Sequence, residues 1–98
     1  MEILKEAING QLRIALKGRL DTATAPQMEK VLQESLADVS ELVLDFTDLT
    51  YISSAGLRVI LGAQKTMSKQ GNMKIHHVNQ DIMEIFDMTG FSTILTIE

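Results

Sequence analysis

Short apolar segments with strand-like spacing alternate with amphipathic segments of helical spacing along this chain of 98 residues. Apolar runs or alternating apolar residues, typical of strands, occupy 3–16, 42–46, 73–78 and 94–97. Apolar residues three and four apart, typical of helices, lie between these runs. Strands separated by helices of this length imply right-handed βαβ crossovers and a mostly parallel sheet. We therefore predict an α/β fold with the element order ββαβαβαβ.

The first strand-like region contains a turn signal at its centre. Asn9-Gly10 lies between Ile3-Leu4 and the alternating residues Leu12, Ile14 and Leu16. Asn-Gly tolerates positive φ at both central positions of a tight turn. The pattern predicts an N-terminal antiparallel hairpin joined to the parallel part of the sheet.

Helix boundaries are indicated by capping residues and by glycine. The segment from Thr24 to Gln27 has the spacing of a capping box, with Pro26 in the first helical turn. Ser53 or Ser54 can cap a second helix, which Gly71-Asn72 ends. A third helix is predicted to end at Gly90.

Composition limits the classes of function. The chain has nine Lys and Arg residues and thirteen Asp and Glu residues, which gives a net charge of −4. Its basic residues are scattered singly along the sequence. This pattern argues against nucleic-acid binding, which requires clustered basic residues. The chain has no cysteine, no Gly/Ser-rich linker and no apolar run of the roughly 20 residues that a membrane span needs. We expect a single domain over 1–98, in the cytoplasm and without a membrane contact.

The stretch 45–58 holds the residues that most suggest a site. A strand leads to Ser53, Ser54 and Gly56 at the start of a helix, where free backbone N–H groups favour an anion. The simpler interpretation is that one serine only caps the helix. The residues alone leave both interpretations open.

A serine hydrolase is the alternative from the enzyme class. It would need a serine activated by His76 or His77 and oriented by Asp45 or Asp48. No Gly-x-Ser-x-Gly elbow is present, and adjacent strand residues point to opposite faces, so one histidine at most could reach a given site. Because His76 and His77 point to opposite faces, they are also unlike a pair of ligands to one metal ion. We therefore expect no enzymatic activity, no metal and no cofactor.

Four segments, in order and at matching spacing, resemble the STAS domain family in its bacterial anti-sigma factor antagonist branch. They cover nearly the whole chain, and they are Gly18-Arg-Leu-Asp21 followed by Thr24-Ala-Pro, Leu42-Val-Leu-Asp-Phe46 with Asp48-Leu, Ile52-Ser-Ser-Ala-Gly-Leu-Arg-Val-Ile-Leu61, and Ile85-Phe-Asp-Met-Thr-Gly-Phe91. The resemblance implies a regulatory binding module of STAS-like fold. Its partner would be an anti-sigma factor that is also a Ser/Thr kinase, and its binding would release a sigma factor for transcription.

The resemblance also implies a phosphorylation switch. In the family pattern, the phosphorylated residue is the first hydroxyl residue after an Asp. Aligning Gly56 and Leu57 with that pattern assigns this role to Ser54. Ser53 replaces the family Asp, and Ala55 takes the second hydroxyl position. A Ser phosphatase would reverse the modification. The residues expected to bind the partner are Asp21, Ser53, Ala55, Gly56 and Arg58.

A second function is compatible with the same family. Other STAS domains act as scaffolds in larger signalling complexes or as nucleotide- or small-ligand-binding modules. Exposure of Ser54 beside a docking surface would favour the phosphorylation switch, whereas a closed pocket lined by Ser54 would favour ligand binding.

Overall fold

The N-terminal hairpin forms around Asn9-Gly10, as predicted. In the computed structural model, which describes residues 1–98, strand β1 (Glu2–Ile8) pairs antiparallel with β2 (Gln11–Leu20). Asn9 and Gly10 have φ angles of +50° and +83°. A two-residue turn with positive φ at both positions matches the twist of the strands that it joins.

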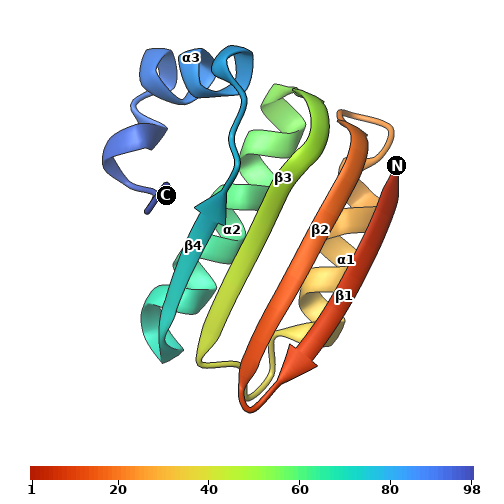
Figure 1. The fold of residues 1–98 in the computed structure, drawn as a ribbon, viewed down its shortest axis with the longest axis vertical. Helices are drawn as coiled ribbons and strands as arrows, with labels where there is room; N and C mark the ends of the chain where they lie inside the picture. Colours follow the sequence, from red (N-terminus) through yellow and green to blue (C-terminus); the bar gives the residue numbers. More distant parts are fainter.

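The rest of the sheet is parallel. Helix α1 (Ala25–Ser35) connects β2 to β3 (Glu41–Ile52), and helix α2 (Ser54–Gln70) connects β3 to β4 (Asn72–His76). Strand β3 pairs parallel with both β2 and β4, so the order across the sheet is β1-β2-β3-β4 (Figure 1). The predicted α/β class with an antiparallel hairpin is confirmed.

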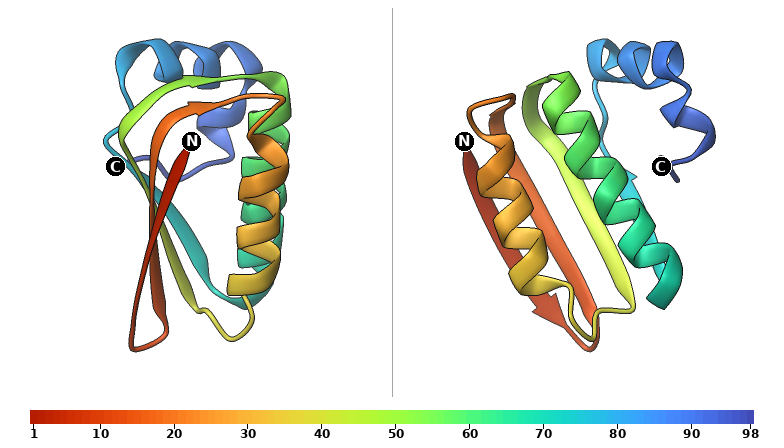
Figure 2. Two further views of the ribbon diagram at one scale, coloured as in Figure 1. Left: turned by 90° about the vertical axis from the view of Figure 1, so that its right-hand side faces the viewer. Right: turned by 180° about the vertical axis from the view of Figure 1, so that it is seen from behind.

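Both crossover helices cover the same face of the sheet. Figure 2 shows α1 and α2 side by side on that face, with the opposite face of β1 and β2 uncovered. Helix α3 (Gln80–Thr89) lies beyond the carboxyl end of β4 (Figure 1). No helix combines the length and the apolar character needed to cross a membrane.

The core lies between the sheet and the two crossover helices. Alternate residues of the central strands are buried because successive strand side chains point to opposite faces. The core side chains of β2 and β3 that follow this alternation are Leu12, Ile14, Leu16, Leu42, Leu44 and Phe46. The helices contribute Met28, Leu32, Ile60 and Met67. The buried residues include no polar or charged side chain, so apolar burial holds these layers together.

The third helix has the predicted ends. The side-chain oxygen of Asn79 accepts a hydrogen bond from the N–H of Ile82 at 2.8 Å, which caps the first turn. Gly90 ends the helix with a φ angle of +82°, a conformation that favours glycine. A short 3₁₀ helix, η1 (Phe91–Thr93), follows it directly.

The predicted last strand over 94–97 is reduced to a single bridge between Ile75 and Ile97. The N–H of Ile75 donates to the carbonyl of Thr96, and the N–H of Glu98 donates to the carbonyl of Ile75, both at 2.9 Å. The segment therefore runs parallel beside β4 at the predicted place. The carbonyl of Phe91 accepts hydrogen bonds from the N–H groups of Ile94 and Leu95, so the turn of η1 continues into the predicted strand and only the residues after Leu95 pair with β4.

Candidate functional site

Two loops meet at the carboxyl end of the sheet and form the candidate site. Leu20, the last residue of β2, pairs with Ile52, the last residue of β3. The N–H of Ser53 donates a hydrogen bond of 2.9 Å to the carbonyl of Leu20. Parallel strands bring their carboxyl ends to one edge, so the loop holding Asp21 lies beside the start of α2.

The two adjacent serines have different roles in the structure. Ser53 is the N-cap of α2, and its hydroxyl accepts a hydrogen bond of 3.4 Å from the N–H of Gly56. Ser54 is the first residue of the helix, is exposed, and its hydroxyl makes no hydrogen bond with the rest of the chain. The capping interpretation therefore applies to Ser53, whereas the Ser54 hydroxyl is free for chemistry.

Gly56 brings the start of α2 close to both strands. A Cβ atom at this position would lie 2.7 Å from the carbonyl oxygen of Leu20 and 2.9 Å from the Cγ1 atom of Ile52. Real Cβ atoms do not approach a backbone oxygen so closely, so any side chain would push the helix away. Gly56 is buried, and its close approach to the strand ends places the two serines against them.

Asp21 is held rigidly in the loop after β2. Its carboxylate accepts hydrogen bonds from the N–H of Thr24 at 3.1 Å and the N–H of Ala23 at 3.0 Å. These bonds, with the N–H of Thr24 as the largest contributor, lower the pKa of Asp21 below its usual value, against a smaller opposing effect of burial. The side chain is thus a fixed negative charge at the edge of the site.

The predicted capping box at Thr24 is wrong. Thr24 is the N-cap of α1, but its side chain forms no cap hydrogen bond. Its hydroxyl instead donates to the carbonyl of Arg19 at 2.7 Å and accepts from the N–H of Asp21 at 2.9 Å. The loop uses this hydroxyl to fix Asp21, so Thr24 serves the candidate site rather than the helix.

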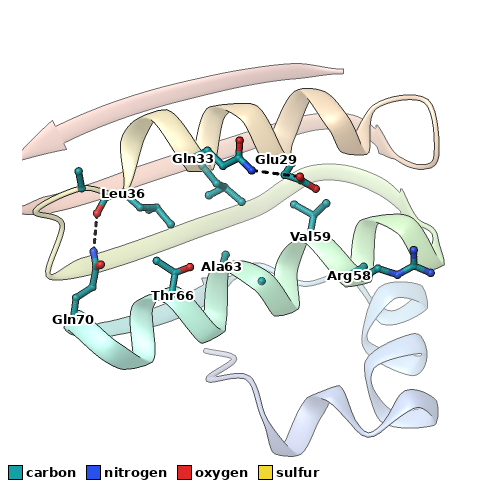
Figure 3. A pocket seen from close by; sticks show the side chains of 11 residues that line it. Glu29, Gln33, Leu36, Arg58, Val59, Ala63, Thr66 and Gln70 are labelled. Atoms are coloured by element: carbon teal, nitrogen blue, oxygen red, sulfur yellow. Dashed lines mark hydrogen bonds between the residues drawn. The ribbon is translucent and has the colours of Figure 1, made fainter.

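Ala55 and Arg58 lie where α2 faces α1. Ala55 is half-buried, and Arg58 is exposed. Figure 3 shows the Arg58 side chain directed toward the start of α2, as helical side chains generally are. Arg58 makes no ion pair within the chain, so its charge is available at the surface next to Ser54.

A groove of about 430 Å³ separates the two crossover helices. Its apolar lining is Leu32, Leu36, Ala37, Val59 and Ala63. Arg58 lies at one end, and at the other end the Gln70 amide donates a hydrogen bond of 2.6 Å to the carbonyl of Leu36 (Figure 3). Ser54 does not line this groove.

The histidines form no catalytic arrangement with Ser54. His76 ends β4, and its Nε2 atom lies 3.3 Å from a carboxylate oxygen of Glu98. Neither His76 nor His77 hydrogen-bonds to Ser54. No three His, Asp or Glu side chains come together in a way that could hold a metal ion.

Asp45 also lies away from Ser54, on the face of the sheet opposite the crossover helices. It pairs with Arg13 at 2.8 Å and accepts hydrogen bonds from the N–H and hydroxyl of Thr47 at 3.0 Å and 2.6 Å. Burial acts to raise the pKa of Asp45, but the bonds from Thr47 and Arg13 together outweigh it and lower the pKa. The arrangement is that of a structural ion pair.

Arg19 and Tyr51 are neighbours of the site that the sequence did not single out. They pair in register on β2 and β3, and the Cζ atom of Arg19 lies 4.2 Å from the centre of the Tyr51 ring. Aligning the two strand ends that precede Asp21 and Ser53 would have placed them side by side.

Comparison with known proteins agrees with this fold and length. Residues 2–98 match the STAS domain family. The chain is 35% identical to BtrV of Bordetella bronchiseptica over 100 residues, which cover 99% of this chain and 85% of that protein. It is 31% identical to the anti-sigma F factor antagonist of Paenibacillus polymyxa over 99% of this chain and 86% of that protein.

Solved structures share the fold. An anti-sigma factor antagonist from Mycobacterium paratuberculosis superimposes with a TM-score of 0.89 at 21% identity, over 98% of this chain and 83% of that chain. SpoIIAA in its phosphorylated form superimposes with a TM-score of 0.77 at 17% identity, over 99% of this chain and 91% of that chain. The chain therefore belongs to the STAS domain family, in the branch of the bacterial anti-sigma factor antagonists.

Proposed function

We propose that this chain is an anti-sigma factor antagonist whose binding is controlled by phosphorylation of Ser54. The partner would be an anti-sigma factor that is also a Ser/Thr kinase, and binding would free a sigma factor for transcription. The relatives named as anti-sigma factor antagonists support the binding role. Because sigma factors act in transcription, this function would place the chain in the bacterial cytoplasm.

The observation that carries the proposal is the free hydroxyl of Ser54. Ser53 caps α2, so modification of Ser54 breaks no hydrogen bond within the chain. Ser54 is exposed at the first position of α2, where a kinase can reach it. SpoIIAA, which has the same fold, exists in an unphosphorylated and a phosphorylated form.

The modification is an ordinary phosphoryl transfer. The Oγ atom of Ser54 would attack the γ-phosphorus of ATP in the kinase, forming an O–P bond while the bond to the β–γ bridging oxygen breaks and ADP leaves. The hydroxyl proton would pass to a base of the kinase. A phosphatase would return the serine by attack of water on phosphorus, with inorganic phosphate as the leaving group.

A phosphate at Ser54 would end binding without unfolding the domain. It adds a charge of about −1.5 to −2, and the start of α2 tolerates an anion. At the interface, contact with the partner would remove the water molecules that hydrate this phosphate. An unpaired charge at a buried interface costs about 2–5 kcal/mol, which corresponds to a loss of roughly 30-fold or more in affinity.

The test is a pull-down from a lysate of the bacterium that encodes the chain, with wild type and Ser54→Asp as baits and mass spectrometry of the bound proteins. We expect a kinase-type anti-sigma factor on wild type alone. The recovered kinase, incubated with ATP, should phosphorylate wild type and Ser53→Ala but not Ser54→Ala.

Two variants control for shape and charge. Ser54→Asn has the shape of the aspartate without its charge, and Ser53→Asp adds the same charge one residue away while remaining able to cap the helix. Ser54→Asn should retain the kinase, and Ser53→Asp should lose less of it than Ser54→Asp, because its carboxylate would accept the cap hydrogen bond from Gly56. Equal recovery on wild type and Ser54→Asp, or no kinase on either, would falsify the phosphorylation switch.

The alternative is a scaffold or a nucleotide- or small-ligand-binding module. The groove between α1 and α2 is the feature that would serve a ligand. The exposure of Ser54, outside that groove, favours the phosphorylation switch. Stabilisation of the chain by ATP or GTP in a thermal unfolding assay, lost in Ala63→Phe, which would obstruct the groove, would favour the alternative.

A further inference from the structure

Arg19 and Tyr51 form a preorganised pair beside the candidate site. The guanidinium of Arg19 stacks on the ring of Tyr51 at 4.2 Å, and the Nε atom of Arg19 lies 3.6 Å from a carboxylate oxygen of Asp21. Asp21 is in turn fixed by Thr24. A chain of contacts therefore connects the rigid loop of Asp21 to an aromatic ring on the neighbouring strand.

The pair points away from the helix layer. Leu20 and Ile52 face α2, since both contact the position of Gly56. Adjacent residues of a strand point to opposite faces, so Arg19 and Tyr51 project from the opposite, outer face at the strand ends. Tyr51 is the only tyrosine of the chain and is 39% exposed, and the Arg19 side chain is 61% exposed.

This combination is characteristic of an interface anchor. Tyr and Arg are enriched among the residues that contribute most to protein binding. A side chain that is already held in place loses less conformational entropy on binding. The two Nη groups of Arg19 have no partner in the chain, and burying them would require an acceptor from outside.

We propose that Arg19 and Tyr51 anchor the interface with the anti-sigma factor. The partner surface that fits them is an apolar pocket for the Tyr51 ring, bordered by a carboxylate that accepts hydrogen bonds from the Nη groups of Arg19. The pair is continuous with the phosphorylation site, because Tyr51 lies three residues before Ser54 and Arg19 lies two residues before Asp21. This inference rests on the proposed function.

The test measures affinity for the anti-sigma kinase identified with the wild-type bait, purified and titrated against each variant of the full chain. Tyr51→Ala should weaken binding about tenfold or more, whereas Tyr51→Phe, which keeps the ring, should stay within about twofold. Arg19→Lys keeps the charge but loses the planar stack and the paired donors, and we expect about a fivefold loss. Ile8→Ala is the control and should bind like wild type, because Ile8 is exposed on β1 and pairs with Gln11, at the opposite end of β2 from Arg19.

The outcomes separate this inference from the proposed function. If wild type binds the kinase and both Tyr51→Ala and Arg19→Lys bind equally well, the anchor is wrong and the proposed function stands. If wild type binds no kinase, the proposed function and the interface anchor are both wrong. If Tyr51→Ala does not fold, Arg19→Lys decides. Sedimentation in which Tyr51→Ala alters self-association, with kinase affinity unchanged, would assign the pair to a second copy and overturn the proposal.

Discussion

The N–H of Ser53 donates a hydrogen bond to the carbonyl of Leu20 at 2.9 Å, and this bond links the two loops of the candidate site. On one side of it, Asp21 follows directly in the chain, and on the other side Ser54 begins α2. Gly56 packs against the same carbonyl. The position of Ser54 relative to Asp21 is therefore set by backbone contacts that side-chain substitutions at either residue leave intact.

The close contact of Gly56 predicts that Gly56→Ala destabilises the domain. The added methyl group would lie 2.7 Å from a backbone oxygen, so α2 must shift, and we expect a loss of about 1–3 kcal/mol in the free energy of unfolding. Gly62→Ala is the control in the same helix, because nothing lies within 4 Å of its added Cβ. That variant should gain about 0.5–1 kcal/mol. Urea denaturation measures both, and equal stability of Gly56→Ala and wild type would contradict the tight contact.

The different roles of the two serines predict different effects on stability. Ser53→Ala removes the cap of α2 and should lower the free energy of unfolding by about 0.5–1 kcal/mol. Ser54→Ala should leave it unchanged, since the Ser54 hydroxyl has no partner in the chain. Thermal and urea unfolding of the two variants check this, and a greater loss for Ser54→Ala would mean that Ser54 is the cap.

The lowered pKa of Asp45 predicts a stability that depends on pH. A carboxyl group whose pKa is lower in the folded than in the unfolded state stabilises the fold above the unfolded pKa of about 3.9. That contribution disappears as the pH falls through the folded pKa. Asp45→Asn should therefore be less stable than wild type at pH 7, and the difference should shrink below about pH 4. Urea denaturation of the two proteins at a series of pH values measures this difference, and a difference that stays constant from pH 7 to below about pH 4 would count against the assignment.

The two hydrogen bonds of the Asn79 side chain predict that this residue stabilises the attachment of α3 to the sheet. Its side chain accepts from the N–H of Ile82 at 2.8 Å and donates to the carbonyl of Leu49 at 3.0 Å. Asn79→Ala loses both bonds and should cost about 1–2 kcal/mol. Asn79→Asp keeps the cap but cannot donate, so an intermediate loss is expected. Hydrogen exchange of the α3 amides reports the effect, and unchanged protection in Asn79→Ala would show that packing alone holds the helix.

The sequence determined the class of fold and most of its elements. The hairpin at Asn9-Gly10, the helix ended by Gly90 and the buried runs of β3 and β4 were predictable because turn conformation and apolar spacing are local properties. The boundaries were less predictable. A local contact shortened the predicted last strand: Ile94 and Leu95 donate hydrogen bonds to the carbonyl of Phe91, and only Ile97 bridges to β4.

Only the tertiary structure decided how the site is arranged. The sequence allowed either serine to cap α2, and the cap falls on Ser53 because its N–H is held by Leu20 from another strand. Thr24 has the spacing of a capping residue, yet its hydroxyl is used by Asp21 and Arg19 in the preceding loop. Arg19 and Tyr51 are 32 residues apart in the chain and meet through strand register. Local spacing specifies helices and strands, whereas hydrogen bonds between strand ends fix which side chains are free to act.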